Sequence, residues 1–237
     1  MDTYQKSARY YDLLSSHKDY RGAAAELARL VRAANPAART LLDVACGTGG
    51  HLQHLRDGFA VEGLDLSGPM LEVAREKCPG VTFHQASLTD FHLDRRYDAI
   101  TCLFGSVGYC ADVAMLRAAL RNMAGHLNPG GVLVIEPWIT AEHFQPGKLT
   151  HDWVDLPELK IARMYVSARE GDTSILDAHF MVATPGGIER FSERHALSLF
   201  TAAQYRDALA ASGLTVLPVD ADPFGYGLYV AVRNASG

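Results

Sequence analysis

Residues 40–49 read Thr-Leu-Leu-Asp-Val-Ala-Cys-Gly-Thr-Gly, which predicts a short buried strand that breaks into a glycine-rich loop. Parallel α/β sheets bind ligands beyond the carboxyl ends of their strands, and glycines there let a ligand approach the backbone closely. The segment Gly47-Thr48-Gly49 is therefore a candidate ligand-binding loop. A glycine-x-glycine segment is also common in ordinary turns, so the residues around it have to distinguish the two.

A second acidic residue follows the loop at an informative distance. Asp65 ends the next predicted strand, 22 residues after Asp43, and a carboxylate at such a strand end reaches ribose hydroxyls. It would repel a phosphorylated ribose. The third glycine of a dinucleotide fingerprint is absent from its place, because Gly50 is followed by His51-Leu52. These features favour a cofactor that carries a free ribose.

Helical and strand-like segments alternate as far as Glu136, which is typical of a parallel sheet with right-handed crossovers. Strand-like pieces without helices follow and indicate an antiparallel elaboration. A last helix ends at Gly213, and we expect the two closely spaced strands after it to pair antiparallel. The expected strands span 40–45, 60–65, 81–85, 97–104, 132–136, 214–219 and 227–232, and expected helices include 19–35, 68–74, 115–127 and 201–212.

The fold class that this pattern predicts is α/β. We expect a Rossmann-like, seven-stranded, mostly parallel sheet with helices on both faces, plus a small antiparallel β lobe inserted after strand five. The expected parts are an N-terminal helical lid (1–39), a cofactor-binding core (40–138), an antiparallel substrate lobe (139–196), and a C-terminal helix and strand pair that complete the core sheet (197–237).

Composition excludes several classes of protein. The chain has 237 residues, a net charge of −5 and no run of like charges, which argues against nucleic acid as a partner. A basic and apolar leader is absent from the N-terminus, and no apolar stretch is long enough to span a bilayer. We therefore expect no membrane partner and a cytoplasmic location.

The cysteines and histidines do not form a metal-binding pattern. Cys46, Cys78, Cys102 and Cys110 lie far apart without a Cys-x-x-Cys pair, and we expect reduced, buried thiols. The pair His51-x-x-His54 has the spacing of two ligands on a helix but lacks the acid and the third ligand of a hydrolytic centre. We expect no bound metal.

The loop and the second acid together resemble the class I S-adenosylmethionine-dependent methyltransferases. The first motif of that family, Asp-x-x-Cys/Gly-Gly-x-Gly, stands here as residues 43–49, and Asn128-Pro129-Gly130-Gly131 is similar to its turn before strand five. The resemblance implies S-adenosylmethionine as the cofactor. It places Asp65 on the ribose, Leu66 and Met70 beside the adenine, and Ala45 and Gly47 beside the methionine moiety. It also assigns Tyr11, Tyr20, Asp43, Gly49, His51, Ser87, Leu88 and Leu103 to cofactor binding.

Further motifs lie outside this core: Tyr11-Asp12-Leu13, Lys18-Asp19-Tyr20, Phe104-Gly105-Ser106-Val107-Gly108-Tyr109, Glu136-Pro137-Trp138, Arg169-Glu170-Gly171 and Leu199-Phe200-Thr201. They resemble the N,N-dimethyltransferases that finish the amino sugars of macrolide antibiotics and act on nucleotide-linked sugars. The narrower resemblance implies a small-molecule amine acceptor, an amino sugar of antibiotic or other secondary-metabolite biosynthesis. A homodimer follows by analogy.

Four segments depart from this narrower group. Ala86-Ser87 replaces Gly-Asp, Ile139 replaces a second tryptophan, Thr140-Ala141 replaces a Phe-Pro, and Gly225-Tyr226 replaces Gly-Arg. Arginine is the better bidentate donor to phosphate. Whether the acceptor carries a nucleotide therefore stays open at the level of the sequence.

Methyl transfer from a sulfonium is an in-line displacement, so the protein chiefly aligns the reacting atoms. Tyr109 is the first candidate for steering or deprotonating the amine, and its ordinary pKa near 10 favours hydrogen bonding over proton abstraction. Glu136 is expected to hold or orient the amine, because acids are costly to bury unless they are paired or used. His143 and His179 are candidate bases in the lobe.

Aromatic residues suit this cofactor because ring faces attract cations within about 6 Å. The resemblance places Tyr11 and Tyr20 where the N-terminal helices close over the sulfonium, and Tyr4 belongs to the same lid. Phe104 and Trp138 are expected to wall the transfer site. Ser106, in the motif of Phe104, is expected to contact the substrate.

Three alternatives remain. A methyltransferase of this kind could act on an oxygen nucleophile, or on the amine of an amino acid or peptide. A nicotinamide-dependent oxidoreductase could use the same kind of sheet, although the missing third glycine counts against it. A non-catalytic protein that binds S-adenosylmethionine would carry the same loop.

Overall fold

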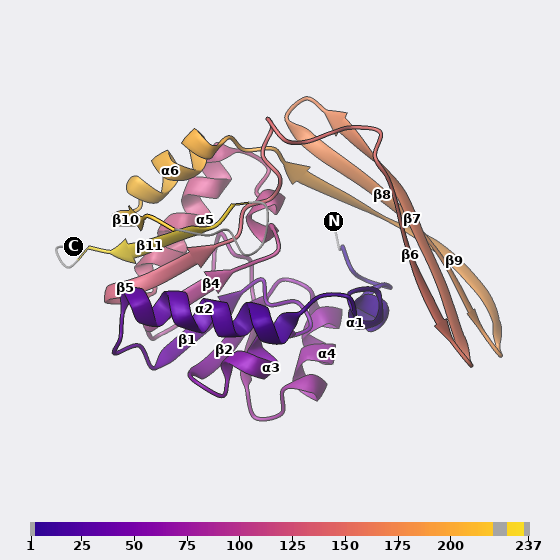
Figure 1. Cartoon of the computed structure of the whole chain (residues 1–237), viewed down its shortest axis with the longest axis horizontal. Helices are drawn as coiled ribbons and strands as arrows, with labels where there is room; N and C mark the ends of the chain where they lie inside the picture. Colours follow the sequence, from indigo (N-terminus) through magenta and orange to yellow (C-terminus); the bar gives the residue numbers. More distant parts are fainter. Residues whose placement is uncertain (1–2, 220–226, 235–237) are drawn as a thin grey trace.

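The computed structural model describes residues 3–219 and 227–234, and its main body is a mixed sheet (Figure 1). Within these ranges seven strands are ordered β10-β11-β5-β4-β1-β2-β3. Strands β1 to β5 pair in parallel, and β11 runs antiparallel to both β5 and β10. The Rossmann-like sheet expected from the sequence is confirmed. Its strands are β1 (Thr40–Val44), β2 (Ala60–Asp65), β3 (Thr82–Gln85), β4 (Tyr97–Cys102), β5 (Leu127–Ile135), β10 (Leu214–Leu217) and β11 (Tyr229–Arg233).

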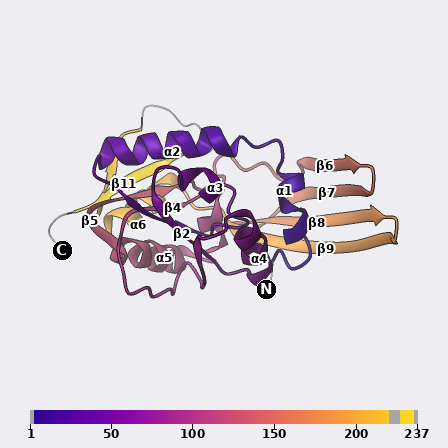
Figure 2. The same ribbon diagram turned by 90° about the horizontal axis from the view of Figure 1, so that it is seen from below.

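Helices cover both faces of this sheet, and each face has its own buried apolar cluster. One cluster includes Leu116 and Leu120 of α5 and Tyr205 of α6. The other includes Leu27 of α2 and Leu52 of α3, and Figure 2 shows α2 and α5 on opposite sides of the sheet. The helices are η1 (Ala8–Tyr10), α1 (Tyr11–Leu14), α2 (Tyr20–Ala34), α3 (Leu52–Leu55), α4 (Gly68–Lys77), η2 (Ser106–Tyr109), α5 (Val113–Gly125) and α6 (Ala202–Ala210).

Among the strand boundaries that differ from the predicted ones, those of β4 and β5 have a clear local cause. β4 ends at Cys102 because Phe104 has left-handed backbone with a φ of +53°, which no strand contains. β5 begins at Leu127, before the predicted turn at 128–131 rather than after it. Leu127 pairs with Tyr97, and the register of β4 against β5 then shifts. The turn residues therefore form an irregularity inside the strand.

A second sheet follows β5 and confirms the predicted antiparallel lobe (Figure 1). Its strands β6 (Leu149–Leu156), β7 (Leu159–Glu170), β8 (Thr173–Thr184) and β9 (Gly187–Ser198) pair in sequence order. On one face, the inner face, Ile161, Phe180 and Val182 pack against Leu14 of α1. The lobe therefore folds over the N-terminal segment.

The cysteines pack in the core. All four are free and buried, as the sequence predicts. Cys46 and Cys78 belong to the apolar cluster of α2, and Cys102 and Cys110 belong to the cluster of α5. In the described ranges, no helix is long and apolar enough to cross a membrane.

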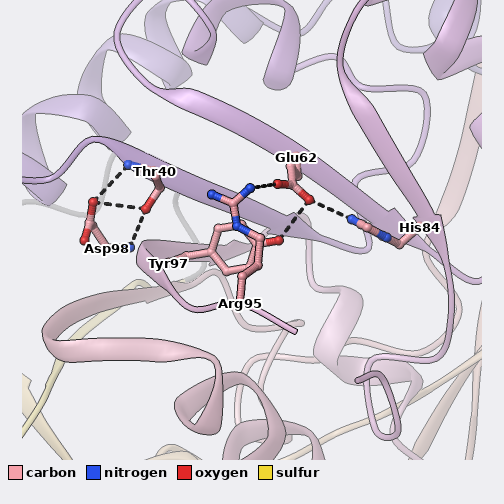
Figure 3. A network of polar contacts seen from close by, with 6 residues as sticks. All are labelled: Thr40, Glu62, His84, Arg95, Tyr97 and Asp98. Atoms are coloured by element: carbon pink, nitrogen blue, oxygen red, sulfur yellow. Dashed lines mark hydrogen bonds and ion pairs between the residues drawn. The ribbon is translucent and has the colours of Figure 1, made fainter. Parts of the chain in front are cut away.

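Asp98 ties three strands together. Its Oδ2 accepts hydrogen bonds from the backbone amides of Arg39 and Thr40 and from Thr40 Oγ1, at 2.9–3.0 Å, and Figure 3 shows its contacts with Thr40. Its Oδ1 accepts one from Asn128 Nδ2 at 2.8 Å. Burial raises the pKa of Asp98, but the hydrogen bonds together lower it by a larger amount. The pKa therefore lies below its ordinary value. Asp98 thus joins β4 to the start of β1 and to β5.

Glu62 of β2 forms a second polar cluster in the same view (Figure 3). Its carboxylate accepts a hydrogen bond from the Tyr97 hydroxyl at 2.9 Å and pairs with Arg95. His84 Nε2 of β3 lies 2.7 Å from the same carboxylate. Because the Tyr97 ring is fully buried, Glu62 satisfies a hydroxyl that would otherwise be costly to enclose.

We expect Asp98→Ala to lower the free energy of unfolding by about 2 kcal/mol or more, because each hydrogen bond to a charged group contributes about 1.5–3 kcal/mol. A depressed pKa stabilises the fold above the pKa of the unfolded carboxyl, and this stabilisation is lost as the pH falls through the folded value. The difference between the variant and the wild type should therefore shrink in acid. Urea unfolding at neutral and acidic pH measures it. Asp94→Ala, at a fully exposed carboxylate, is the control, and equal stabilities of all three proteins would contradict this role.

Candidate functional site

A cavity of about 1270 Å³ lies at the carboxyl ends of β1, β2, β4 and β5. Residues from the N-terminal segment (3–20) and from the inner face of the lobe line its other side. The chain order reverses between β1 and β4, which is where open α/β sheets bind ligands. The cavity exceeds the roughly 300–1,000 Å³ of a site for one drug-sized molecule, so it has room for a cofactor and an acceptor together.

The loop after β1 has left-handed backbone at three positions. Ala45, Gly47 and Gly49 have φ angles of +58°, +54° and +75°. Glycine adopts this conformation freely, whereas it costs a residue with a Cβ about 1–2 kcal/mol. Gly50 serves a different purpose, because a Cβ there would lie 2.6 Å from the ring of Tyr20. The loop sequence therefore follows from its backbone shape and from the close approach of α2.

Asp65 joins this loop to the start of α4. Its Oδ2 accepts a hydrogen bond from the Gly47 amide and its Oδ1 accepts one from the Ser67 amide, both at 2.8 Å. Burial raises the pKa of Asp65, against the lowering effect of these amides. Each carboxylate oxygen accepts more than one hydrogen bond. Asp65 therefore retains capacity to accept from ribose hydroxyls in the cavity.

Asp43 is a buried acid in the same wall. It is 2% exposed, and its Oδ1 accepts a hydrogen bond from Thr101 Oγ1 at 2.6 Å. Burial raises the pKa of Asp43 to about 7, although the Thr101 hydrogen bond opposes the rise and the charge of Asp65 adds to it. A nearby cation favours the ionised form of such a group. Asp43 is therefore suited to a positively charged ligand.

Three rings form an aromatic wall beside the loop. The centroids of Tyr20, His51 and Phe104 lie 4.8–5.6 Å apart. The Lys18 ammonium lies 3.8 Å from the centroid of Phe104, so this ring face binds a cation in the structure. Burial lowers the pKa of Lys18, against the attraction of Glu136.

His51 has an unsatisfied polar atom. It is 5% exposed, and burial, followed by the charge of Lys18, lowers its pKa to about 3, so the ring is neutral. Its Nε2 has no hydrogen-bond partner in the part of the chain that the structure describes. A buried polar atom without a partner is costly, and a polar group of a ligand in the cavity would satisfy it.

These residues fit S-adenosylmethionine. Asp65 can accept from its ribose, the aromatic wall of Tyr20, His51 and Phe104 attracts positive charge, and His51 offers a free ring nitrogen to its polar end. Leu66 and Met70 line the cavity close to Asp65 and would give the adenine an apolar surface.

Comparison with known proteins agrees with this geometry. A family described as "Methyltransferase domain" matches residues 41–131. The dTDP-3-amino-3,6-dideoxy-alpha-D-glucopyranose N,N-dimethyltransferase of Streptomyces fradiae is 44% identical over 234 residues, which cover 97% of this chain and 92% of that enzyme. The chain belongs to the S-adenosylmethionine-dependent sugar N,N-dimethyltransferases.

Two solved structures share the whole fold of this methyltransferase. Streptomyces venezuelae DesVI has a TM-score of 0.90 at 43% identity, covering 96% of this chain and 98% of DesVI. CalS10, an amino pentose methyltransferase of calicheamicin biosynthesis from Micromonospora echinaspora, was solved with bound S-adenosylmethionine. Its TM-score is 0.82 at 41% identity over 92% of each chain. The cofactor and the reaction predicted from the sequence are confirmed, and the nicotinamide-dependent alternative is wrong.

Most residues that the sequence assigns to the site line the cavity of the methyltransferase. They come from the N-terminal segment and from the carboxyl ends of β1 to β5. They are Tyr4, Tyr11, Tyr20, Asp43, Ala45, Gly47, His51, Asp65, Leu66, Met70, Ser87, Leu88, Leu103, Phe104, Ser106, Tyr109, Glu136 and Trp138.

Three assigned residues lie outside the cavity lining. Gly49 faces α4, since a Cβ there would lie 3.3 Å from Cys78 Sγ. His143 is exposed, and its Nδ1 lies 2.8 Å from Thr140 Oγ1. His179 is exposed on β8, on the outer face of the lobe that points away from α1. The structure therefore brings neither candidate base of the lobe, His143 or His179, into the cavity lining.

Glu136 has a structural contact within the site. It is 4% exposed, and its Oε2 accepts a hydrogen bond from the Phe104 amide at 2.8 Å. Because Phe104 has left-handed backbone, this hydrogen bond stabilises the strained turn after β4 and holds the Phe104 ring in the cavity wall.

Glu193 of β9 anchors the N-terminal segment. Its Oε1 accepts hydrogen bonds from the amides of Lys6 and Ser7 at 3.0 and 3.1 Å, and its Oε2 accepts one from Ser7 Oγ. Glu189, which precedes Glu193 in the same strand, forms ion pairs with Lys6 and Arg9. These contacts place Tyr4 in the wall of the cavity.

The residues that line the cavity but were missed by sequence reasoning include Lys18, Arg163 and His195. Lys18 belongs to the motif Lys18-Asp19-Tyr20, from which the sequence predicts the family but no contact of Lys18 with the cavity. Arg163 pairs with Asp152 across β6 and β7 at 2.6 Å, and His195 Nδ1 lies 2.8 Å from the Tyr109 hydroxyl. Strand alternation could have found Arg163 and His195, since side chains at every second position share the inner face.

We expect Asp65→Asn to weaken binding of S-adenosylmethionine at least about tenfold, since about 1.4 kcal/mol corresponds to a factor of ten and the amide accepts at only one oxygen. Isothermal titration measures the affinity, and thermal unfolding reports whether the loop remains folded. The matched control is Asp57→Asn at an exposed position. An unchanged affinity in a folded variant would refute the contact with the ribose.

Proposed function

We propose that this methyltransferase dimethylates the amino group of a nucleotide-linked deoxyamino sugar in antibiotic or other secondary-metabolite biosynthesis. The main support for this proposal is that similarity to the S. fradiae enzyme spans 97% of the chain. It includes the N-terminal segment and the lobe as well as the core. We assign residues 1–39 as the lid and 139–196 as the acceptor lobe, and the cytoplasmic location stays a prediction.

One arginine of the lobe supports an acceptor that carries phosphate. Arg163 lines the cavity from the inner face of β7. It pairs with Asp152. A guanidinium has five N–H donors, so Arg163 keeps donors for a further acceptor such as a diphosphate. Gly225-Tyr226, which replaces the arginine of the relatives, lies outside the described residues.

The chain's own residues chiefly align the reactants. S-adenosylmethionine, when bound, supplies an electrophilic methyl group. The Phe104 ring face stabilises the positive charge, and the Glu136 carboxylate orients the amine. Burial raises the pKa of Tyr109 well above its ordinary value, so its hydroxyl stays protonated and steers the amine by hydrogen bonding. Holding the amine in line with the methyl group supplies several kcal/mol of the acceleration.

Incubation with S-adenosylmethionine and a dTDP-linked 3-amino-3,6-dideoxyglucose should yield a product heavier by two methyl groups that replace two N–H hydrogens. Mass spectrometry with fragmentation locates both groups on nitrogen. The same sugar without the nucleotide should react more slowly, because it lacks the phosphates. A single methyl group on oxygen, or preference for an amino acid or peptide amine, would contradict the proposal.

We also propose that the chain forms a homodimer through the outer face of the lobe. Strand register places Trp153, Ala162 and Met181 in one row on this face, and Trp153 and Met181 are 65% and 44% exposed. Such apolar patches mark interfaces, and a two-fold axis lets one patch pair with its own copy. Asp155 and Lys160, beside the patch, pair with each other, so these two charges offset each other.

Trp153→Glu should shift the sedimentation coefficient from that of a dimer to that of a monomer, because a carboxylate would be buried without a partner. Gln53→Glu, at an exposed position on α3, adds the same charge away from the lobe and should leave the dimer intact. A wild-type protein that sediments as a monomer would refute the interface.

A further inference from the structure

His195 lies in the cavity wall at the end of a short chain of hydrogen bonds. Its Nδ1 is 2.8 Å from the Tyr109 hydroxyl, and that hydroxyl is 3.1 Å from the hydroxyl of Tyr4. The His195 ring also packs on Tyr4 with centroids 4.9 Å apart. The three side chains come from β9, η2 and the N-terminal segment and meet in the cavity.

The protonation states of His195 and Tyr109 determine how a proton can move between them. Burial lowers the pKa of His195, so the imidazole is neutral at neutral pH. Burial raises the pKa of Tyr109, so its hydroxyl keeps its proton. In the tautomer that carries its proton on Nε2, His195 Nδ1 accepts a hydrogen bond from the Tyr109 hydroxyl, and the lone pairs of the Tyr109 oxygen remain available to accept another.

Double methylation of an amine requires such an acceptor. Each transfer converts a neutral amine into an ammonium, which has no lone pair. A second transfer can follow only when one N–H proton has left. A first transfer to an amine that binds in its neutral form requires no loss of a proton. The proton therefore has to leave between the two transfers.

We propose that His195 accepts this proton through Tyr109. The ammonium N–H bond breaks as its proton passes to the Tyr109 oxygen, and the Tyr109 O–H bond breaks as a new N–H bond forms at His195 Nδ1. The amine regains its lone pair, Tyr109 is again a neutral phenol, and the positive charge lies on the imidazole. This inference rests on the proposed dimethylation.

The surroundings of His195 suit a transient charge. Glu193, on the same strand, favours the imidazolium, and Arg163, from β7, disfavours it. The other titratable groups that contact the ring are Tyr4 and Tyr109. With one opposing and one favouring charge, His195 can gain the proton and then release it before the next turnover.

The test compares His195→Asn with His195→Ala. Asparagine retains an oxygen near the position of Nδ1, so it still accepts the Tyr109 hydrogen bond but takes no proton. His179→Asn is the control, at an exposed histidine on the outer face of the lobe. Mass spectrometry follows the mono- and dimethylated sugar over time and over a range of pH, with S-adenosylmethionine affinity measured in parallel.

We expect His195→Asn to preserve cofactor affinity and the first transfer, and to slow the second transfer about 100-fold, the lower end of the usual contribution of general acid–base catalysis. Monomethylated sugar should accumulate. In the wild type the second transfer should become slower as the pH falls through the pKa of His195, since a protonated imidazole accepts nothing, and the variant should lack this dependence.

Two results would overturn the inference. One is a His195→Asn variant with the wild-type ratio of products and the wild-type pH profile. The other is an equal slowing of both transfers, which would show that His195 only positions Tyr109. If the wild type does not methylate the sugar at all, the proposed function fails. This failure is separate from failure of the His195 inference, because the wild type is measured before any variant.

Discussion

The carboxylate of Asp65 holds the cofactor side of the cavity together. Its hydrogen bonds to the amides of Gly47 and Ser67 connect the loop after β1 to the first turn of α4. The loop can take this course only with left-handed backbone, which explains its glycines. Because the carboxylate is oriented before a ligand arrives, no rearrangement of this side chain opposes binding.

The opposite side of the cavity, which we propose receives the acceptor, depends on different interactions. It is built by the N-terminal segment and the lobe, which are far apart in the sequence and meet through Glu193 and through the packing of Leu14 on the lobe. The cofactor side uses local backbone geometry, whereas the acceptor side uses long-range side-chain contacts. A family can therefore keep the first and vary the second, which suits a fold that serves many acceptors.

The sequence predicts the local features well and the long-range ones poorly. Strand periodicity and turn chemistry locate the strands of the core, and the spacing from Asp43 to Asp65 correctly predicts that both acids lie at the cavity. The contact of Asp65 with the ribose stays a prediction. Phe104 is misplaced at the end of β4, because its backbone depends on the buried Glu136, a tertiary contact. His195 is missed for the same reason, since its partner Tyr109 lies 86 residues away, and His143 looked functional only by residue type.

Tyr4 adds one more consequence. Its φ of +68° is left-handed backbone in a residue with a large side chain, and this conformation costs about 1–2 kcal/mol. The contacts of Glu193 and Glu189 with the first ten residues hold the segment closed against this strain. Part of the stabilisation from these contacts therefore offsets the cost of the Tyr4 backbone. Without the Glu193 and Glu189 carboxylates this cost would be uncompensated, and the Tyr4 ring would lose its place in the cavity wall.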